Sequence, residues 1–255
     1  MQATITDIKE FYTFTSLLES FDENVKFQCL PEGIVIQSMG NGHTCIIKTN
    51  LNKDYFDNYE CADKVDIGMN MSTLNSILKK AKKGEQVSFS SDGQKIHFQF
   101  AFGLSFDMKL IDLDQEELDI PELEYNFSSM LNPQLLKDWS SQIVEMTKGS
   151  VTFSFQYGSN SNDMEVEEDT MTLVSEGESF TVKKDENLSF NIKSDPESMS
   201  LGYKSMKIIT SLASFNKDIC MCFQNNMPIE FSFDLNNHAS IECYFAPQMS
   251  EEEDL

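Results

Sequence analysis

The sequence repeats itself across its midpoint, and this repeat limits the possible folds more than any other feature. Gly68 lies 21 residues before Phe89, and Gly202 lies 21 residues before Phe223. Each interval spans a helical pattern and the opening of a strand pattern. After a shift of one residue the next strands also correspond: Ile96, Phe98 and Phe100 match Ile229, Phe231 and Phe233. Such a repeat predicts two similar units, each with the order helix, strands, helix, strands.

Apolar spacing predicts where the elements lie. Intervals of three and four predict four helices, at residues 8–21, 72–83, 133–146 and 203–215. Gly84 is expected to end the second helix. Alternating patterns predict strands at 25–30, 34–38, 43–48, 65–69, 87–89, 96–100 and 104–111, and at 151–155, 171–174, 180–182, 188–192, 219–223, 229–233 and 240–245.

An acidic stretch at residues 110–125 joins the two halves. Half of the residues from 112 to 123 are carboxylates, and the apolar ones among them follow neither a helical nor a strand period. Pro121 removes a backbone donor and favours an extended conformation at Ile120. Taken alone, the stretch is either an interdomain linker or a functional loop.

The composition limits the classes of partner. The formal net charge is −23, and all 19 basic residues are lysine. This charge argues against a surface coated for nucleic acid, because phosphate binding needs cations. The absence of arginine means either that no bidentate base reader exists or that the genome favours lysine codons.

Neither catalysis nor a cofactor is expected. The three histidines show no metal-binding spacing, and the chain has no Gly-rich nucleotide loop and no nucleophile elbow. The six cysteines include no C-x-x-C pair and are predicted to be reduced and mostly buried in an intracellular protein. Cys220 and Cys222 flank Met221, which would put both on one face of a strand. The N-terminus lacks a signal-peptide pattern, and no apolar run approaches the length of a membrane span.

Four motifs make the chain recognisable. They are QSMGNGH at 37–43, LIDLD at 110–114, LDIPELEY at 118–125 and YFAP at 244–247. In this order and spacing the sequence resembles the proliferating cell nuclear antigen family, the eukaryotic DNA sliding clamps. The resemblance covers the whole chain, including the acidic tail.

The resemblance implies an α+β fold with two similar DNA-clamp domains, each with antiparallel sheets and two helices, that assemble into a closed homotrimeric ring. The implied divisions are clamp domain 1 at 1–110, an interdomain connector at 111–125, clamp domain 2 at 126–249 and a C-terminal tail at 250–255. The implied function is a polymerase processivity factor that encircles duplex DNA without sequence preference and tethers polymerase, clamp loader, nuclease and ligase proteins. The location would be the nucleus, or a viral replication compartment. Two alternatives remain open: a checkpoint subunit of a mixed trimer, and a processivity subunit that works without a closed ring.

The resemblance also implies three groups of site residues. Phosphate contacts would come from helix lysines, namely Lys9, Lys79, Lys80, Lys83, Lys137, Lys204 and Lys207. Partner peptides would enter a hydrophobic pocket under the connector lined by Met39, His43, Thr44, Ile46, Leu118, Ile120, Pro121, Pro228, Tyr244, Ala246 and Pro247. Subunits would pair through edge strands at 104–110 and 170–176, with Phe106, Met108, Leu110, Met171 and Leu173 at the interface.

The sequence differs from the family pattern in the basic residues of its helices. Tyr12 and Thr13 occupy positions where the family usually has adjacent lysines, and Asp138 and Ser141 replace basic residues on the third helix. The predicted basic surface is therefore concentrated on the second helix. There, helical periodicity would put Lys79 and Lys83 on one face.

Overall fold

The computed structural model describes residues 1–6, 8–40, 42–114, 118, 120, 123–144, 149–156, 169–184, 188–192, 198–224, 227–235 and 238–248. The chain divides into two compact units. Unit 1 comprises Met1–Pro121 and Asp234–Cys243, and unit 2 comprises Glu122–Phe233 and Tyr244–Leu255. The clamp-domain divisions expected from the sequence stay a prediction.

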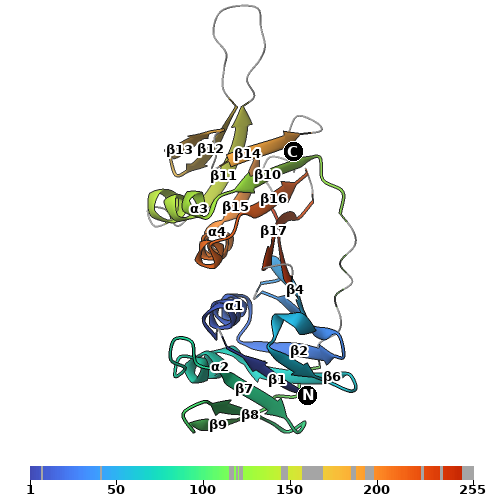
Figure 1. Ribbon diagram of the computed structural model, residues 1–255. Coiled ribbons are helices and arrows are strands. Elements are labelled where there is room, and N and C mark those ends of the chain that lie inside the picture. The colour runs from blue at the N-terminus through green and yellow to red at the C-terminus, as the bar shows by residue number, and fades with distance from the viewer. Residues whose placement is uncertain are drawn as a thin grey trace, which may run out of the picture. The chain divides into compact units, whose positions relative to one another are not determined.

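Unit 1 contains two antiparallel sheets and two α-helices (Figure 1). Its elements are β1 (Gln2–Ile5), α1 (Ile8–Phe21), β2 (Asn24–Leu30), β3 (Gly33–Met39), β4 (Cys45–Asn52), the 3₁₀ turn η1 (Lys53–Tyr55), β5 (Asn58–Glu60), β6 (Val65–Asn70), α2 (Met71–Leu78), β7 (Val87–Ser91), β8 (Lys95–Phe100) and β9 (Ser105–Lys109). One sheet has the order β5-β1-β7-β8-β9. In the other, β6, β2, β3 and β4 follow one another, and β4 pairs next with β18 (Ala239–Phe245).

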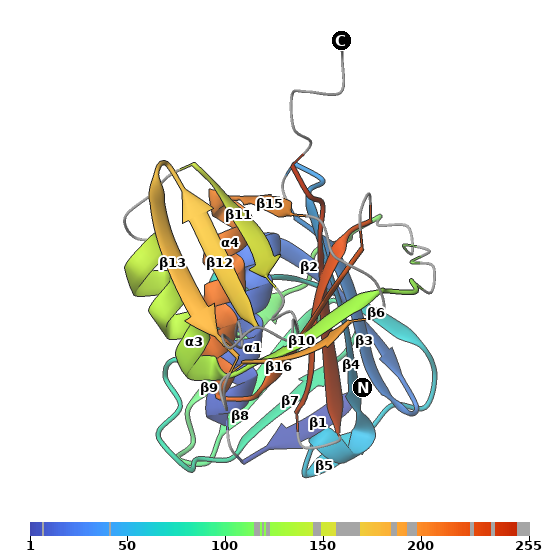
Figure 2. The ribbon, with the colours of Figure 1, turned by 90° about the horizontal axis from the view of Figure 1, so that it is seen from above.

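Unit 2 repeats this plan. Its elements are β10 (Phe127–Leu131), α3 (Pro133–Trp139), the π-helix η2 (Ser140–Val144), β11 (Ser150–Gln156), β12 (Thr170–Ser175), β13 (Glu178–Lys183), β14 (Leu188–Ile192), β15 (Met199–Gly202), α4 (Tyr203–Ser211), the 3₁₀ turn η3 (Leu212–Phe215), β16 (Ile219–Phe223) and β17 (Ile229–Leu235). The sheet orders are β14-β10-β16-β17 and β13-β12-β11-β15. Helices α3 and α4 lie side by side against the sheet that carries β11, β12 and β13 (Figures 1 and 2).

The strand orders confirm the repeat predicted from the sequence. The order β5-β1-β7-β8 in unit 1 corresponds to β14-β10-β16-β17 in unit 2, and β4-β3-β2-β6 corresponds to β13-β12-β11-β15. Gly68 and Gly202 both lie in the strand that precedes the second helix of their unit. The matched apolar residues of β8 and β17 are all buried.

Helix α1 fits its prediction because its apolar residues hold one face. Phe11, Phe14 and Leu18 are buried, and the Phe11 ring stacks on Phe89 of β7 at a centroid distance of 5.9 Å. In unit 2, Trp139 of α3 makes an edge contact with Phe153 of β11, which belongs to the other sheet of the repeat, at 5.4 Å. In both units a helix is thus fixed to the sheet by aromatic packing.

The prediction for the second helix is wrong at its C-terminal end. Helix α2 stops at Leu78, and turns at residues 79–80 and 83–84 follow it. The backbone N–H of Lys80 bonds back three residues to the Ile77 carbonyl, and the Lys82 N–H donates to the Glu85 carboxylate at 2.8 Å. A side chain that captures the Lys82 amide replaces the carbonyl that a helix would supply. The third helix also changes character, because the α-helix ends at Trp139 and continues as η2; residues 145–146 lie outside the described part.

Candidate functional site

The outward face of β3 and β4 carries two residues of the predicted peptide pocket. Met39 and Ile46 are cross-strand partners and are half-buried. The opposite face of the same strands is buried in unit 1, with Ile36 and Ile47 fully covered. Because side chains alternate along a strand, the core fixes which residues face outward.

The turn between β3 and β4 presents two more predicted residues. His43 and Thr44 are exposed, and His43 has a positive φ of 57°. The turn closes through the Gly40 N–H, which donates to the Cys45 carbonyl at 2.8 Å. The His43 Nδ1 atom lies 2.8 Å from the Met39 sulfur. The histidine therefore borders the apolar pair formed by Met39 and Ile46.

The connector is attached to unit 1 at two points. The Ile111 N–H donates to the Gly68 carbonyl of β6 at 2.8 Å, and the Leu118 N–H donates to the Gln37 side-chain oxygen at 2.9 Å. A Cβ atom on Gly68 would overlap the Ile111 carbonyl oxygen, so this close approach requires glycine. Leu118 and Ile120 are half-buried, whereas Pro121 lies outside the described residues.

The remaining pocket residues belong to unit 2. Pro228 and Ala246 are exposed, and Tyr244 and Pro247 are half-buried. The Tyr125 hydroxyl donates to the Pro228 carbonyl at 3.1 Å, and burial raises the pKa of this tyrosine. Tyr125 therefore holds the Pro228 turn. Both Tyr125 and Gln37 lie inside the recognised motifs, yet the prediction named neither of them as a site residue.

The predicted phosphate contacts are all solvent-exposed lysines. In unit 1, Lys9 lies on α1, while Lys79, Lys80 and Lys83 lie in the turns after α2. The argument that a helix aligns Lys79 with Lys83 is therefore wrong. Lys79 instead lies over the Tyr12 ring, with Nζ 5.7 Å from its centroid.

In unit 2 the basic residues lie on helices. Lys137 is on α3, and Lys204 and Lys207 are three residues apart on α4. The last two share a face, because residues three apart are neighbours on a helix surface. The buried residues of α4, including Met206 and Ile209, occupy the other side. The α4 pair is thus held outward by the packing of its own helix.

One predicted edge strand is confirmed as an edge and the other is wrong. Within the described sheets β9 pairs only with β8, so it is an edge. Strand β12 pairs with β11 on one side and β13 on the other. Met171 and Leu173 are therefore core residues with no exposed surface, and the end strands of this sheet are β13 and β15. The sequence could not show this because the choice of edge depends on the β12–β13 hairpin.

Comparisons with known proteins agree with these arrangements. Residues 8–121 match the family model "Proliferating cell nuclear antigen, N-terminal domain". The proliferating cell nuclear antigen of Chaetomium thermophilum is 23% identical over 246 residues, which cover 91% of each chain. Residues 8–121 belong to the proliferating cell nuclear antigen family. The members of this family are non-enzymatic sliding clamps involved in DNA replication and repair.

Two solved structures share the fold of this clamp. The proliferating cell nuclear antigen of Entamoeba histolytica superposes with a TM-score of 0.82 at 19% identity, covering 97% of this chain and 98% of that one. That of A. fulgidus, bound to the C-terminal region of FEN-1, has a TM-score of 0.82 at 17% identity, with coverages of 98% and 99%. No helix in the described part of the clamp is long and apolar enough to cross a membrane.

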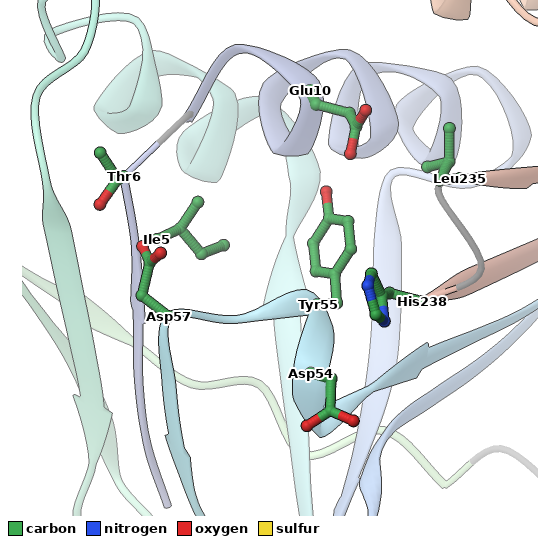
Figure 3. A pocket seen from close by; sticks show the side chains of 8 residues that line it. All are labelled: Ile5, Thr6, Glu10, Asp54, Tyr55, Asp57, Leu235 and His238. Carbon is green, nitrogen blue, oxygen red and sulfur yellow. The ribbon is translucent and has the colours of Figure 1, made fainter.

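Unit 1 of the clamp also holds a pocket that contains none of the predicted site residues. Its volume is about 230 Å³, and its lining includes Glu10, Asp54, Asp57 and His238. Figure 3 shows the Tyr55 hydroxyl directed toward Glu10 on α1. Three carboxylates would repel phosphate, so this pocket is not a candidate site for contact with the DNA backbone.

Proposed function

We propose that this clamp forms a closed homotrimeric ring around duplex DNA. The observation that supports the ring is a strand pairing inside one chain. In unit 1, the Asn52 N–H donates to the His238 carbonyl at 2.9 Å, the Asn50 and Ser240 side chains bond, and Lys48 pairs with Glu242 at 3.6 Å. These contacts run in antiparallel order along β4 and β18. Strand β4, at the end of the β4-β3-β2-β6 series, thus pairs with β18, at the end of the β14-β10-β16-β17-β18 series.

The repeat extends this pairing to a second copy of the chain. Strand β9 follows β8 as β18 follows β17, and β13 has the position in unit 2 that β4 has in unit 1. The described sheets have six end strands, and among them β9 and β13 are the counterparts of β18 and β4. A head-to-tail pairing of β9 with the β13 of the next copy would repeat the β18–β4 contact, and such an interface can close into a ring. Open strand edges are otherwise an association hazard.

The helix-borne and turn-borne lysines are the proposed DNA contacts. Cations on an otherwise acidic protein concentrate attraction for phosphate where they cluster. Because lysines bind the backbone as point charges, the contact would be independent of sequence and would allow sliding. The wild-type chain should therefore be retained on circular or end-blocked duplex and should be lost from free-ended duplex.

Replication and repair proteins are the proposed binding partners. We infer that their clamp-binding peptides contact Met39 and Ile46 on β3 and β4 and the connector of unit 1. The half-buried apolar side chains and few polar groups suit an amphipathic helical turn. The A. fulgidus relative was solved with the C-terminal region of FEN-1 bound to it. A nuclear location remains part of this proposal.

Solution mass tests the ring directly. Multi-angle light scattering of the purified chain at micromolar concentration should give one species of three times 29.1 kDa. A monomer that enlarges only with unlike partner chains would support the checkpoint-type mixed trimer instead. A monomer that still raises polymerase processivity would support a subunit that works without a closed ring.

A further inference from the structure

Two thiols lie next to each other on the outward face of unit 2. Cys220 and Cys222 are alternate residues of β16, and their sulfur atoms are 3.4 Å apart. Both are half-buried and free. The residues between and beside them, Ile219, Met221 and Phe223, point into the core and are buried. The strand therefore holds the two sulfurs together at the surface.

The neighbouring strands add a third sulfur. In the β10–β16 register, Met130 is the cross-strand partner of Cys220, and its side chain is 42% exposed. Directly opposed residues of antiparallel strands have Cβ atoms about 4.5–5.5 Å apart, within reach of a methionine side chain. Within the described residues no group of three or more His, Cys, Asp or Glu could hold a metal. The sulfur ligands are thus two thiols and a thioether, and the Glu230 carboxylate of β17 lies opposite Cys222.

The strand geometry disfavours a disulfide at this position. Alternate residues of a strand are about 6.6 Å apart, from a rise of about 3.3 Å per residue. A disulfide needs Cβ atoms about 3.5–4.5 Å apart, so closing it would distort β16. A metal ion bridges a wider gap, because two metal–sulfur bonds of about 2.3 Å hold their sulfurs about 4 Å apart.

We propose that Cys220, Cys222 and Met130 form a binding site for one Cu(I) ion. Thiolate and thioether ligands select this soft ion over harder divalent ions. Binding replaces the two thiol protons with the ion and changes no oxidation state. The hydrogen bond between the two sulfurs lowers the pKa of Cys220 and raises that of Cys222.

Anaerobic titration of the full-length, reduced clamp with Cu(I) tests the site. The ultraviolet charge-transfer band of Cu(I)-thiolate should saturate at one ion per chain, and competition with bicinchoninate gives the affinity. Cys220→Ser and Cys222→Ser should each lose this binding, and Met130→Leu should weaken it. Cys61→Ser, which changes another partly exposed thiol, should leave it unchanged.

The possible results distinguish a Cu(I) site from a Zn²⁺ site and from a disulfide pair. Circular dichroism and light scattering of each variant establish that the fold and the oligomer are intact. Unchanged Cu(I) affinity in both cysteine variants would overturn the proposal. So would a Zn²⁺ affinity equal to that for Cu(I), or a loss of 2 Da under mild peroxide without any Cu(I) binding, because the latter identifies a disulfide pair.

Discussion

Asn75 is a buried amide that connects the two helices of unit 1. It is only 3% exposed and accepts a hydrogen bond from the Thr15 hydroxyl at 2.6 Å. Its own N–H₂ group donates to the Glu19 carboxylate at 2.6 Å. The sequence places Asn75 within an apolar stripe, so periodicity gave no reason to expect a polar link between α1 and α2.

Asn75→Ala should lower the free energy of unfolding by about 1–3 kcal/mol, because the Glu19 carboxylate would lose its amide donor and the Thr15 hydroxyl would keep only its longer bond to the Tyr12 carbonyl, at 3.2 Å. Urea denaturation of the purified variant measures the change. Ser76→Ala, at the neighbouring exposed position of α2, is the matched control and should stay within about 0.5 kcal/mol of wild type. Equal midpoints for the two variants would mean that the Asn75 network adds nothing to stability.

Substitution of Ile46 tests the peptide-binding proposal most directly. Ile46→Ala should weaken a peptide of the FEN-1 C-terminal type by about 1–2 kcal/mol, because it removes one wall of the apolar pair with Met39. Isothermal calorimetry gives the affinity. Val35→Ala, on the same outward face of β3 but four residues from Met39, is the control and should bind normally. Loss of affinity in both variants would indicate general damage to the sheet.

At the scale of elements, the connector depends on Gly68. Gly68→Ala should displace the Ile111 carbonyl and speed hydrogen exchange at the Ile111 amide, since the added Cβ meets backbone there. Gly202→Ala is the control from the other half of the repeat, where the added Cβ meets only the flexible end of the Gln248 side chain. Exchange at Ile111 that is unchanged by the first variant would show that the connector adjusts without losing this bond.

The turn after α2 carries the densest basic run. Replacing Lys79, Lys80 and Lys83 with alanine should reduce the salt dependence of retention on end-blocked duplex, by about one unit of slope for each lysine that binds a phosphate. A triple replacement of Lys26, Lys53 and Lys64, in strands and loops, removes the same charge and serves as the control. Equal slopes for the two triple variants would place the DNA-binding surface elsewhere.

The elements also show what the sequence could predict. Helix α1 and the repeated apolar strands were predictable because one periodic face packs on one sheet. The end of α2 was not, since the apolar period continues to Ala81 while the Glu85 side chain diverts the Lys82 amide. The edge strand of unit 2 was missed for a related reason. The end of α2 and the position of β12 both depend on particular contacts between residues, which apolar spacing does not encode. The predicted peptide-binding residues were found only through their sequence motifs.

At the scale of the whole molecule, the ring proposal identifies which backbone N–H groups of β13 and β9 point outward and can bond to another copy of the chain. The Lys184 N–H bonds to the Asp169 carbonyl, and the β12–β13 register continues from there, so the Thr181 N–H points away from β12. The Leu110 N–H bonds to the Gln94 carbonyl, and by the same alternation the Asp107 N–H points away from β8. Proline at either position removes an outward donor and leaves the strand's own ladder intact.

Thr181→Pro and Asp107→Pro should therefore each give a folded chain that no longer forms trimers, whereas Thr181→Ala and Asp107→Ala should remain trimeric. The mixture of the two proline variants is the decisive sample. In a head-to-tail interface, the intact β9 of the Thr181→Pro chain can pair with the intact β13 of the Asp107→Pro chain. Both remaining edges are blocked, so growth must stop at a dimer of one chain of each kind. Native mass spectrometry of the equimolar mixture should show this heterodimer. Two monomers that do not associate, or homodimers of either variant alone, would contradict pairing of β9 with β13.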